Sequence, residues 1–179
     1  MIVRGLVPLC LSCLLAACGG DSPGRAAARG DIPALESLVA AGQPLESADA
    51  GGMSALHRAA AASQADAVRW LLQQGVPAGT PDARGWTPLH YAASAGCVEC
   101  VDALLGAGVD PDPSAEQGFR PLHLAAIEGH GEVARRLVLA GADPGARAQD
   151  GLTAEEFAGR HGDSATVDAI SESARSMRR

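Results

Sequence analysis

Residues 85–110 read GWTPLHYAASAGCVECVDALLGAGVD, and residues 118–143 read GFRPLHLAAIEGHGEVARRLVLAGAD. The second stretch begins 33 residues after the first and keeps three of its four glycines, its PLH triplet and its alanine pair. The same period links further columns of residues: Gly52, Gly85, Gly118 and Gly151; His57, His90 and His123; and Leu71, Leu104, Leu137 and Ile170. Several columns at one period indicate an internal repeat, so the fold is expected to be a stack of similar units.

Each unit predicts two short helices joined by a turn. Thr87 is a favourable N-cap and Pro88 a favourable first helical residue, so a first helix begins here. Gly96 breaks that helix, and apolar residues at helical spacing follow from about Val98. Gly108 stands where a left-handed residue ends the second helix. No such unit buries its apolar face alone, so neighbouring units must stack.

This unit resembles the ankyrin repeat in its TPLH box, its alanine pair, the glycine between its helices and its closing GAD. The resemblance covers about residues 22–172 and implies an all-α ankyrin solenoid of helix–turn–helix repeats with β-turn tips. We expect an N-terminal cap repeat and a polar C-terminal cap repeat to enclose three better-matched units, with a frayed tail after them. The expected ranges are 22–49 and 149–172 for the caps, 50–82, 83–115 and 116–148 for the units, and 173–179 for the tail.

The first 17 residues, MIVRGLVPLCLSCLLAA, have the pattern of a secretory signal peptide. Their apolar run is too short for the roughly 20 residues of a membrane-spanning helix. Residues 15–18, LAAC, resemble the lipobox of bacterial lipoproteins, which implies cleavage before Cys18 and attachment of lipid to it. The alternative is an ordinary cleaved signal peptide in which Cys18 has no such role.

The lipoprotein resemblance also predicts where the chain works. Gly19 follows the cysteine, and lipoproteins without Asp at that position tend to be exported to the outer membrane rather than kept in the inner one. Residues 18–21 form a short linker that reaches roughly 10 Å at most. We therefore expect a periplasmic domain that sits against a bacterial membrane, with the outer membrane favoured.

Composition and motifs exclude several classes of protein. The net charge is −7 and all 14 basic residues are arginines, so we expect no nucleic-acid partner. The sequence contains no G-x-S-x-G, no H-E-x-x-H and no phosphate-binding loop. We therefore expect no enzymatic activity and no cofactor.

Histidine and cysteine are the residues that could suggest a metal or redox site. His57, His90 and His123 belong to the repeat's own TPLH column, so we expect structural roles and no metal site. Cys97 and Cys100 also stand on repeat positions, and zinc would need two further ligands. Three interpretations of this pair stay open: small core residues, a local disulfide, or a redox-active pair at a helix N-terminus.

The resemblance implies that partners dock on a concave face made of the turn tips and the exposed side of each first helix. One column precedes the TPLH box and consists of Met53, Trp86, Phe119 and Leu152; we call it the tip column. Large apolar residues in register predict a binding surface with aromatic anchors. Further contacts are expected from Arg84, Gln117, Ile127 and Glu128. The alternative is that the tip column only packs between adjacent turns.

These observations predict a non-enzymatic protein-binding module of the bacterial cell envelope, one that supports an envelope enzyme. One alternative is an immunity protein that neutralises a periplasmic toxin. Another is a thiol-redox protein that uses Cys97 and Cys100. We expect the protein partner to bind a monomer, and the membrane to be reached through lipid on Cys18.

Overall fold

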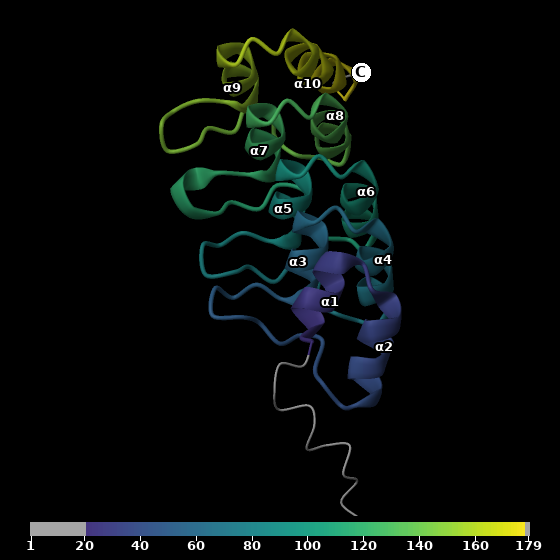
Figure 1. Ribbon diagram of the computed structural model, residues 1–179. Coiled ribbons are helices and arrows are strands. Elements are labelled where there is room, and N and C mark those ends of the chain that lie inside the picture. The colour runs from purple at the N-terminus through teal and green to yellow at the C-terminus, as the bar shows by residue number, and fades with distance from the viewer. Residues whose placement is uncertain (1–20, 178–179) are drawn as a thin grey trace, which may run out of the picture.

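The computed structural model describes residues 21–177, which contain helices but no strands. The helices pair along the chain as a short first helix followed by a second one (Figure 1). The first helices are α1 (Pro23–Arg29), α3 (Ala55–Ala61), α5 (Pro88–Ser94), α7 (Pro121–Ile127) and α9 (Ala154–Arg160). The second helices are α2 (Ile32–Ala40), α4 (Ala65–Gln73), α6 (Val98–Gly106), α8 (Gly131–Leu139) and α10 (Ser164–Ser176).

The five pairs stack into two helical layers. Figure 1 shows the first helices in one layer and the second helices in the other, with the connecting loops projecting to the side of the first helices. Each first helix packs on its counterparts in the adjacent pairs, as α3 does on α1 and α5, and the second helices α4, α6, α8 and α10 pack in the same way. The all-helical solenoid predicted from the 33-residue period is therefore confirmed.

Small residues allow the helices of adjacent repeats to approach closely. The alanine pairs of the first helices, such as Ala59 with Ala60 and Ala92 with Ala93, are fully buried. The second helices add one large apolar residue per repeat to this core: Leu35, Leu71, Leu104, Leu137 and Ile170. The core is therefore a continuous strip that runs through the stack, and each repeat completes the core of its neighbour.

A histidine closes the start of each internal first helix. The imidazole Nδ1 atom of His90 accepts a hydrogen bond from the backbone N–H of Thr87 at 3.1 Å, and His57 and His123 do the same three residues after their N-caps. This arrangement satisfies a backbone donor that has no partner within the helix. In the last repeat Glu156 takes this place and accepts from the N–H of Thr153 at 2.8 Å.

The same histidines connect each repeat to the next. Since Nδ1 is an acceptor, Nε2 carries the proton and donates to a carbonyl of the following repeat. His57 donates to Trp86 O at 3.1 Å, His90 to Phe119 O at 3.3 Å and His123 to Ala146 O at 3.1 Å. Burial lowers the pKa of all three side chains, and that of His90 to about 4, although the hydrogen bond to the carbonyl opposes the shift. The histidines are therefore neutral structural bridges, as the sequence predicted.

The repeat that contains α7 departs from the TPLH pattern at one position. Arg120 stands where the other repeats have Ser54, Thr87 or Thr153, and an arginine has no acceptor with which to cap a helix. Its guanidinium instead donates to the backbone carbonyl of Asp112 at 2.8 Å and pairs with the Asp112 carboxylate. Burial raises the pKa of that carboxyl, and the charge of Arg120 opposes the rise.

Backbone hydrogen bonds connect the loop tips to one another. The amides of Ala83, Glu116 and Gln149 donate to the carbonyls of Gly51, Arg84 and Gln117, each on the preceding tip, at 2.8–3.1 Å. These bonds fix the spacing and the height of successive tips. Side chains that occupy the same position in the repeat are consequently held in line.

One turn between paired helices has serine at the position where the other turns have glycine. Gly30, Gly96 and Gly129 adopt left-handed conformations, and the N-cap residue of the following repeat lies over each of them. A Cβ atom on Gly96, for example, would lie 2.6 Å from the ring of His130. Ser63 takes the same position in its repeat with a φ of 56°. The N-cap that follows it in register is Cys97, a smaller side chain than Gln64 or His130, which leaves room for the serine.

The C-terminal helix is longer than expected. α10 continues to Ser176, whereas the sequence predicted a frayed tail from residue 173. The prediction was wrong over this stretch because Ser173 is buried and its hydroxyl donates to Ala169 O at 2.7 Å. α10 also packs against α8, and Ala174 in its last turns packs against the core.

We expect the free energy of unfolding to decrease as the pH falls from 6.5 towards about 4. In that window the unfolded histidines take up protons, whereas the folded ones stay neutral, so protonation favours the unfolded chain. Above pH 6.5 both states are neutral and the effect disappears. For His90 alone the full loss corresponds to about 3 kcal/mol.

Urea unfolding at about pH 7.5 and about pH 4.5 measures this loss. His90→Gln should show a smaller difference between the two pH values than the wild type. His161→Gln, which removes an exposed histidine, is the control and should keep the wild-type difference. If the wild type and His90→Gln lost the same free energy of unfolding between the two pH values, the structural role of the neutral His90 side chain would be contradicted.

We also expect opposite effects from two substitutions in the turn column. Ser63→Gly should raise the free energy of unfolding by about 1 kcal/mol, because glycine adopts a positive φ without strain. Gly96→Ser should lower it by more than about 2 kcal/mol, since the new side chain meets the His130 ring. Urea unfolding of both variants tests this contrast, and equal tolerance of serine at both positions would contradict it.

Candidate protein-binding surface

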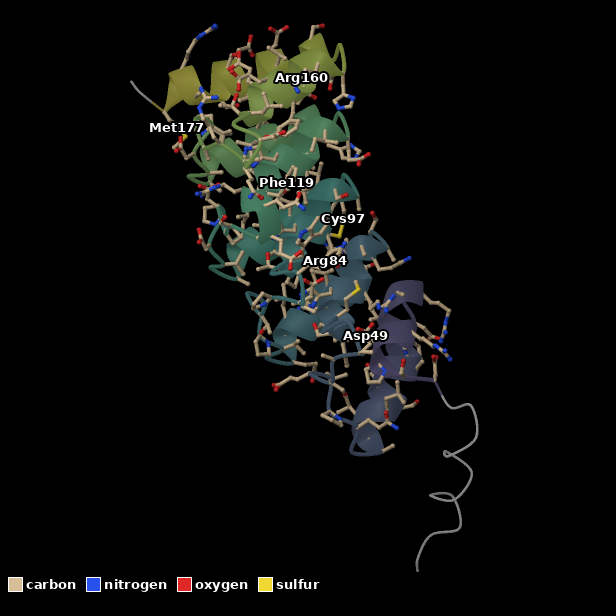
Figure 2. All side chains as sticks on the ribbon, turned by 90° about the vertical axis from the view of Figure 1, so that its left-hand side faces the viewer. Asp49, Arg84, Cys97, Phe119, Arg160 and Met177 are labelled. Carbon is tan, nitrogen blue, oxygen red and sulfur yellow. A yellow bond between two sulfur atoms is a disulfide. The ribbon has the colours of Figure 1, made fainter. Side chains whose placement is uncertain are left out.

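The tip column lies on the side of the stack formed by the loop tips and the exposed sides of the first helices; following the ankyrin resemblance, we call this side the concave face. Figure 2 looks onto this face and shows Asp49, Arg84 and Phe119 following one another along the stack. All four members of the tip column, Met53, Trp86, Phe119 and Leu152, are half-buried. Each therefore packs on its own repeat and still presents part of its surface to solvent.

A second column, on the first helices, forms the floor beside the tip column. Its members are Arg58, Tyr91, Leu124 and Phe157, also 33 residues apart, and we call it the helix column. The Tyr91 ring lies 5.3 Å from the Trp86 ring, and the Phe157 ring lies 5.9 Å from that of Phe119. Arg58 and Tyr91 add accessible surface beside the tip column, whereas Leu124 and Phe157 are 7% and 8% exposed and support it from beneath. The accessible apolar row that crosses four repeats is therefore the tip column itself.

Sequence reasoning missed the helix column, although the signal was present. These residues directly follow the TPLH histidine, or Glu156 in the last repeat, and occur at the same period. Their rings also cover the bridging histidines: Tyr91 lies edge-on to His57 at 5.8 Å, and Phe157 lies edge-on to His123 at 5.8 Å. Tyr91 and Phe157 thus cover the neutral imidazoles of His57 and His123 and support the tip column.

Arg84 is held by a cluster of polar and aromatic side chains on the second tip. Its guanidinium carbon lies 4.5 Å from the centroid of the Trp86 ring, and Nη2 donates to the Tyr91 hydroxyl at 2.6 Å. The Tyr91 hydroxyl in turn donates to Asp82 at 2.6 Å. We call Asp82, Arg84, Trp86 and Tyr91 the Arg84 cluster; it joins the two columns at the middle of the face.

Asp82 is the buried member of the Arg84 cluster. Its side chain is 2% exposed, and one carboxylate oxygen accepts the backbone N–H groups of Arg84 and Trp86 at 2.8 and 2.9 Å. Burial by itself would raise the pKa of Asp82, but the hydrogen bonds from the Tyr91 hydroxyl and from these two backbone N–H groups outweigh it and lower the pKa. Asp82 therefore stabilises the backbone of the tip from inside, and its side chain is not available to contact a partner.

The remaining predicted contact residues lie at two separate places. Gln117 is exposed at the third tip, where it adopts a left-handed φ of 58°. Ile127 and Glu128 lie at the opposite end of α7, a helix of about 10 Å, where the chain turns towards α8. Only Gln117 is therefore close to the tip column, whereas Ile127 and Glu128 border the far edge of the face.

Cys97 and Cys100 are joined in a disulfide at the start of α6. Cys97 is the N-cap of this helix, and its sulfur accepts the backbone N–H of Cys100 at 3.2 Å. Both side chains are buried: Cys100 is completely inaccessible and Cys97 is 6% exposed. The sulfur atoms therefore present little surface to another protein.

The described part of the chain offers no sign of two other kinds of site. Residues 21–177 contain no group of three or more His, Cys, Asp and Glu side chains that could hold a metal ion. Nor does any helix in that range have the length and apolar character that a membrane crossing needs. The signal peptide and the lipid site predicted at Cys18 lie outside the described residues.

We expect the Cys97–Cys100 bond to contribute about 2 kcal/mol to stability, the value for closing so short a loop. A reductant should therefore lower the midpoint of urea unfolding of the wild type, but not that of Cys97→Ser/Cys100→Ala. Serine at position 97 keeps an acceptor for the helix N-terminus. Two free thiols in the untreated protein, together with an unchanged midpoint after reduction, would contradict the pairing.

Comparison with known proteins agrees with the geometry. A family model for three copies of the ankyrin repeat matches residues 24–115, and a model for a single ankyrin repeat matches residues 117–149. A search of curated proteins found no match. The matched residues contain α1 to α8 and both columns of the concave face except their last members. The chain therefore belongs to the ankyrin repeat family.

Proposed function

We propose that this chain is a non-enzymatic adaptor of the bacterial cell envelope that holds a protein partner on its concave face. Ankyrin repeats are protein–protein interaction modules, so the family gives the class of function but not the partner. The observation that carries the proposal is the row of four half-buried apolar residues in the tip column, which the helix column supports. Its aromatic residues are held in fixed positions before any partner arrives.

Rigidity is the physical reason why this surface suits binding. Trp86 lies against the Arg84 guanidinium and the Tyr91 ring, and Phe119 lies against Phe157. Their conformational freedom is therefore already lost in the free protein, and a partner loses less free energy on ordering them. Half-buried aromatic residues with polar neighbours are also the residues that dominate protein interfaces.

The envelope location rests on the signal pattern and on LAAC at residues 15–18. Lipid on Cys18 would hold the first repeat close to the membrane, with the periplasmic side of the outer membrane favoured. The partner would then be another envelope protein, and we favour an enzyme that the adaptor supports. A toxin neutralised by an immunity protein is the competing identity.

A thiol-redox function receives less support from the geometry. A thiolate must reach the disulfide of its substrate, and exchange slows when the sulfur is inaccessible. Cys97 and Cys100 are both buried, and they lie at the start of a second helix rather than in the tip column. We therefore propose that the disulfide stabilises its own repeat.

Partner capture from crosslinked envelopes tests the proposal. We expect Trp86→Ala/Phe119→Ala to lose a protein that the wild type recovers, because the two substitutions remove adjacent aromatic anchors. Each single substitution should weaken capture by about tenfold or more. Mass spectrometry of the recovered protein then separates an enzyme from a toxin.

Trp70→Ala is the matched control, because Trp70 is a half-buried tryptophan on α4, in the layer of second helices. Circular dichroism must show equal helicity in all variants. A partner that is lost with Trp70→Ala but kept by the double variant would move the site to the outer surface. Retention by both variants would exclude the tip column as the anchor.

A further inference from the structure

Arg84 combines a fixed position with an accessible charge. Trp86 and Tyr91 hold its guanidinium, at 4.5 and 5.9 Å from their ring centroids, and the Tyr91 hydroxyl accepts one of its N–H groups. The side chain is nevertheless 55% exposed. Since an arginine has five N–H donors and the aromatic rings occupy a face of the group, donors remain available at its open edge.

The acidic neighbour of Arg84, Asp82, does not form a close ion pair with it. Asp82 approaches Arg84 Nε only to 3.8 Å, and its two oxygens already accept two backbone N–H groups and the Tyr91 hydroxyl. Arg58 and Arg120, on the adjacent repeats, instead form close ion pairs with Asp49 and Asp112. Arg84 is thus the better placed of these three to bind an acid from outside.

The surroundings of Arg84 define what such an acid must look like. Trp86 and Phe119 lie on the same and on the next tip, both half-buried, so apolar surface adjoins the guanidinium. The tip column also continues on both sides, to Met53 in one direction and to Phe119 and Leu152 in the other. A partner chain that fills this surface must pass Arg84 and continue, which favours an internal acidic side chain over a terminal carboxylate.

We propose that Arg84 binds the carboxylate of an Asp or Glu side chain of the partner, within an extended segment that also places an aromatic or aliphatic residue against Trp86 and Phe119. The inference rests on the proposed function of the concave face. A guanidinium matches a carboxylate with two parallel hydrogen bonds, and charge-assisted bonds of this kind are the strong ones. Because the rings and Tyr91 already orient Arg84, little side-chain freedom is lost on binding.

The same cluster suggests one competing arrangement. Asp82, Trp86 and Tyr91 surround a guanidinium, so an arginine of the partner could displace Arg84 and take its place. The carboxylate is favoured because Asp82 is 2% exposed and its acceptor positions are already filled, so displacement would break bonds within the tip.

Peptide selection on the purified full chain tests the inference without a known partner. A display library of random peptides of about 12 residues is long enough, at roughly 3.3 Å per residue, to cross several repeats. Enriched peptides are synthesised with a free or an amidated C-terminus, and again with each Asp or Glu changed to Asn or Gln. Fluorescence anisotropy then measures their affinities for the wild type, Arg84→Gln, Arg84→Lys and Phe119→Ala.

We expect the enriched peptides to contain an acidic residue near an aromatic or aliphatic one. Arg84→Gln should weaken their binding by about tenfold or more, and Arg84→Lys by less. The peptide in which Asn or Gln replaces the acidic residue should bind the wild type more weakly by a similar factor. Its affinity should then be the same for the wild type and for Arg84→Gln, which would show that the two groups interact. Arg69→Gln is the control; it removes an exposed arginine from α4 and should change nothing.

Four results would overturn the inference. Peptides that depend on Phe119 but bind Arg84→Gln equally well would leave the proposed function standing and exclude the carboxylate. Arginine-containing peptides that bind Arg84→Gln more tightly would support displacement instead, and sensitivity to C-terminal amidation would assign the contact to a terminal carboxylate. A selection that yields no peptide dependent on either residue would count against the concave face as a binding surface altogether.

Discussion

A neutral, buried imidazole in each internal first helix is the contact on which the stack of repeats depends. Through Nδ1 it completes the start of its own helix, and through Nε2 it donates to a carbonyl of the following repeat. One side chain thus couples a local requirement of the helix to the packing of two units. The coupling works only while the imidazole is uncharged, and the low dielectric of the core keeps it so by lowering its pKa.

The concave face follows from this contact. His57 and His90 bind the carbonyls of Trp86 and Phe119, which are members of the tip column, so the histidine bridges position the residues proposed to bind a partner. Tyr91 and Phe157 cover His57 and His123 and at the same time form the floor beside that column. Stability and binding therefore share residues here, and the surface is rigid because it is the edge of the core.

Departures from the repeat pattern show how the stack tolerates variation. Ser63 replaces a glycine in a left-handed turn, and the small side chain of Cys97 leaves room above it. Arg120 replaces a capping residue and forms an ion pair with Asp112 instead. Both exceptions are compensated by a residue nearby in the stack, as expected where each unit contacts only its neighbours.

The sequence by itself determined the fold and most of the tip column, because a strict 33-residue period requires equivalent residues to occupy equivalent places. It also assigned the histidines to structure, since their column belongs to the repeat. It could not show that Asp82 is buried, that the rings of Tyr91 and Phe157 pack against the tip column, or that α10 extends to Ser176. Those features depend on distances between side chains of different repeats, or on packing against α8, and a repeat pattern contains no such distances. The position of Arg84 between Trp86, Tyr91 and Asp82 was likewise decided only by the tertiary structure, because the tip must fold back on α5 before these side chains meet.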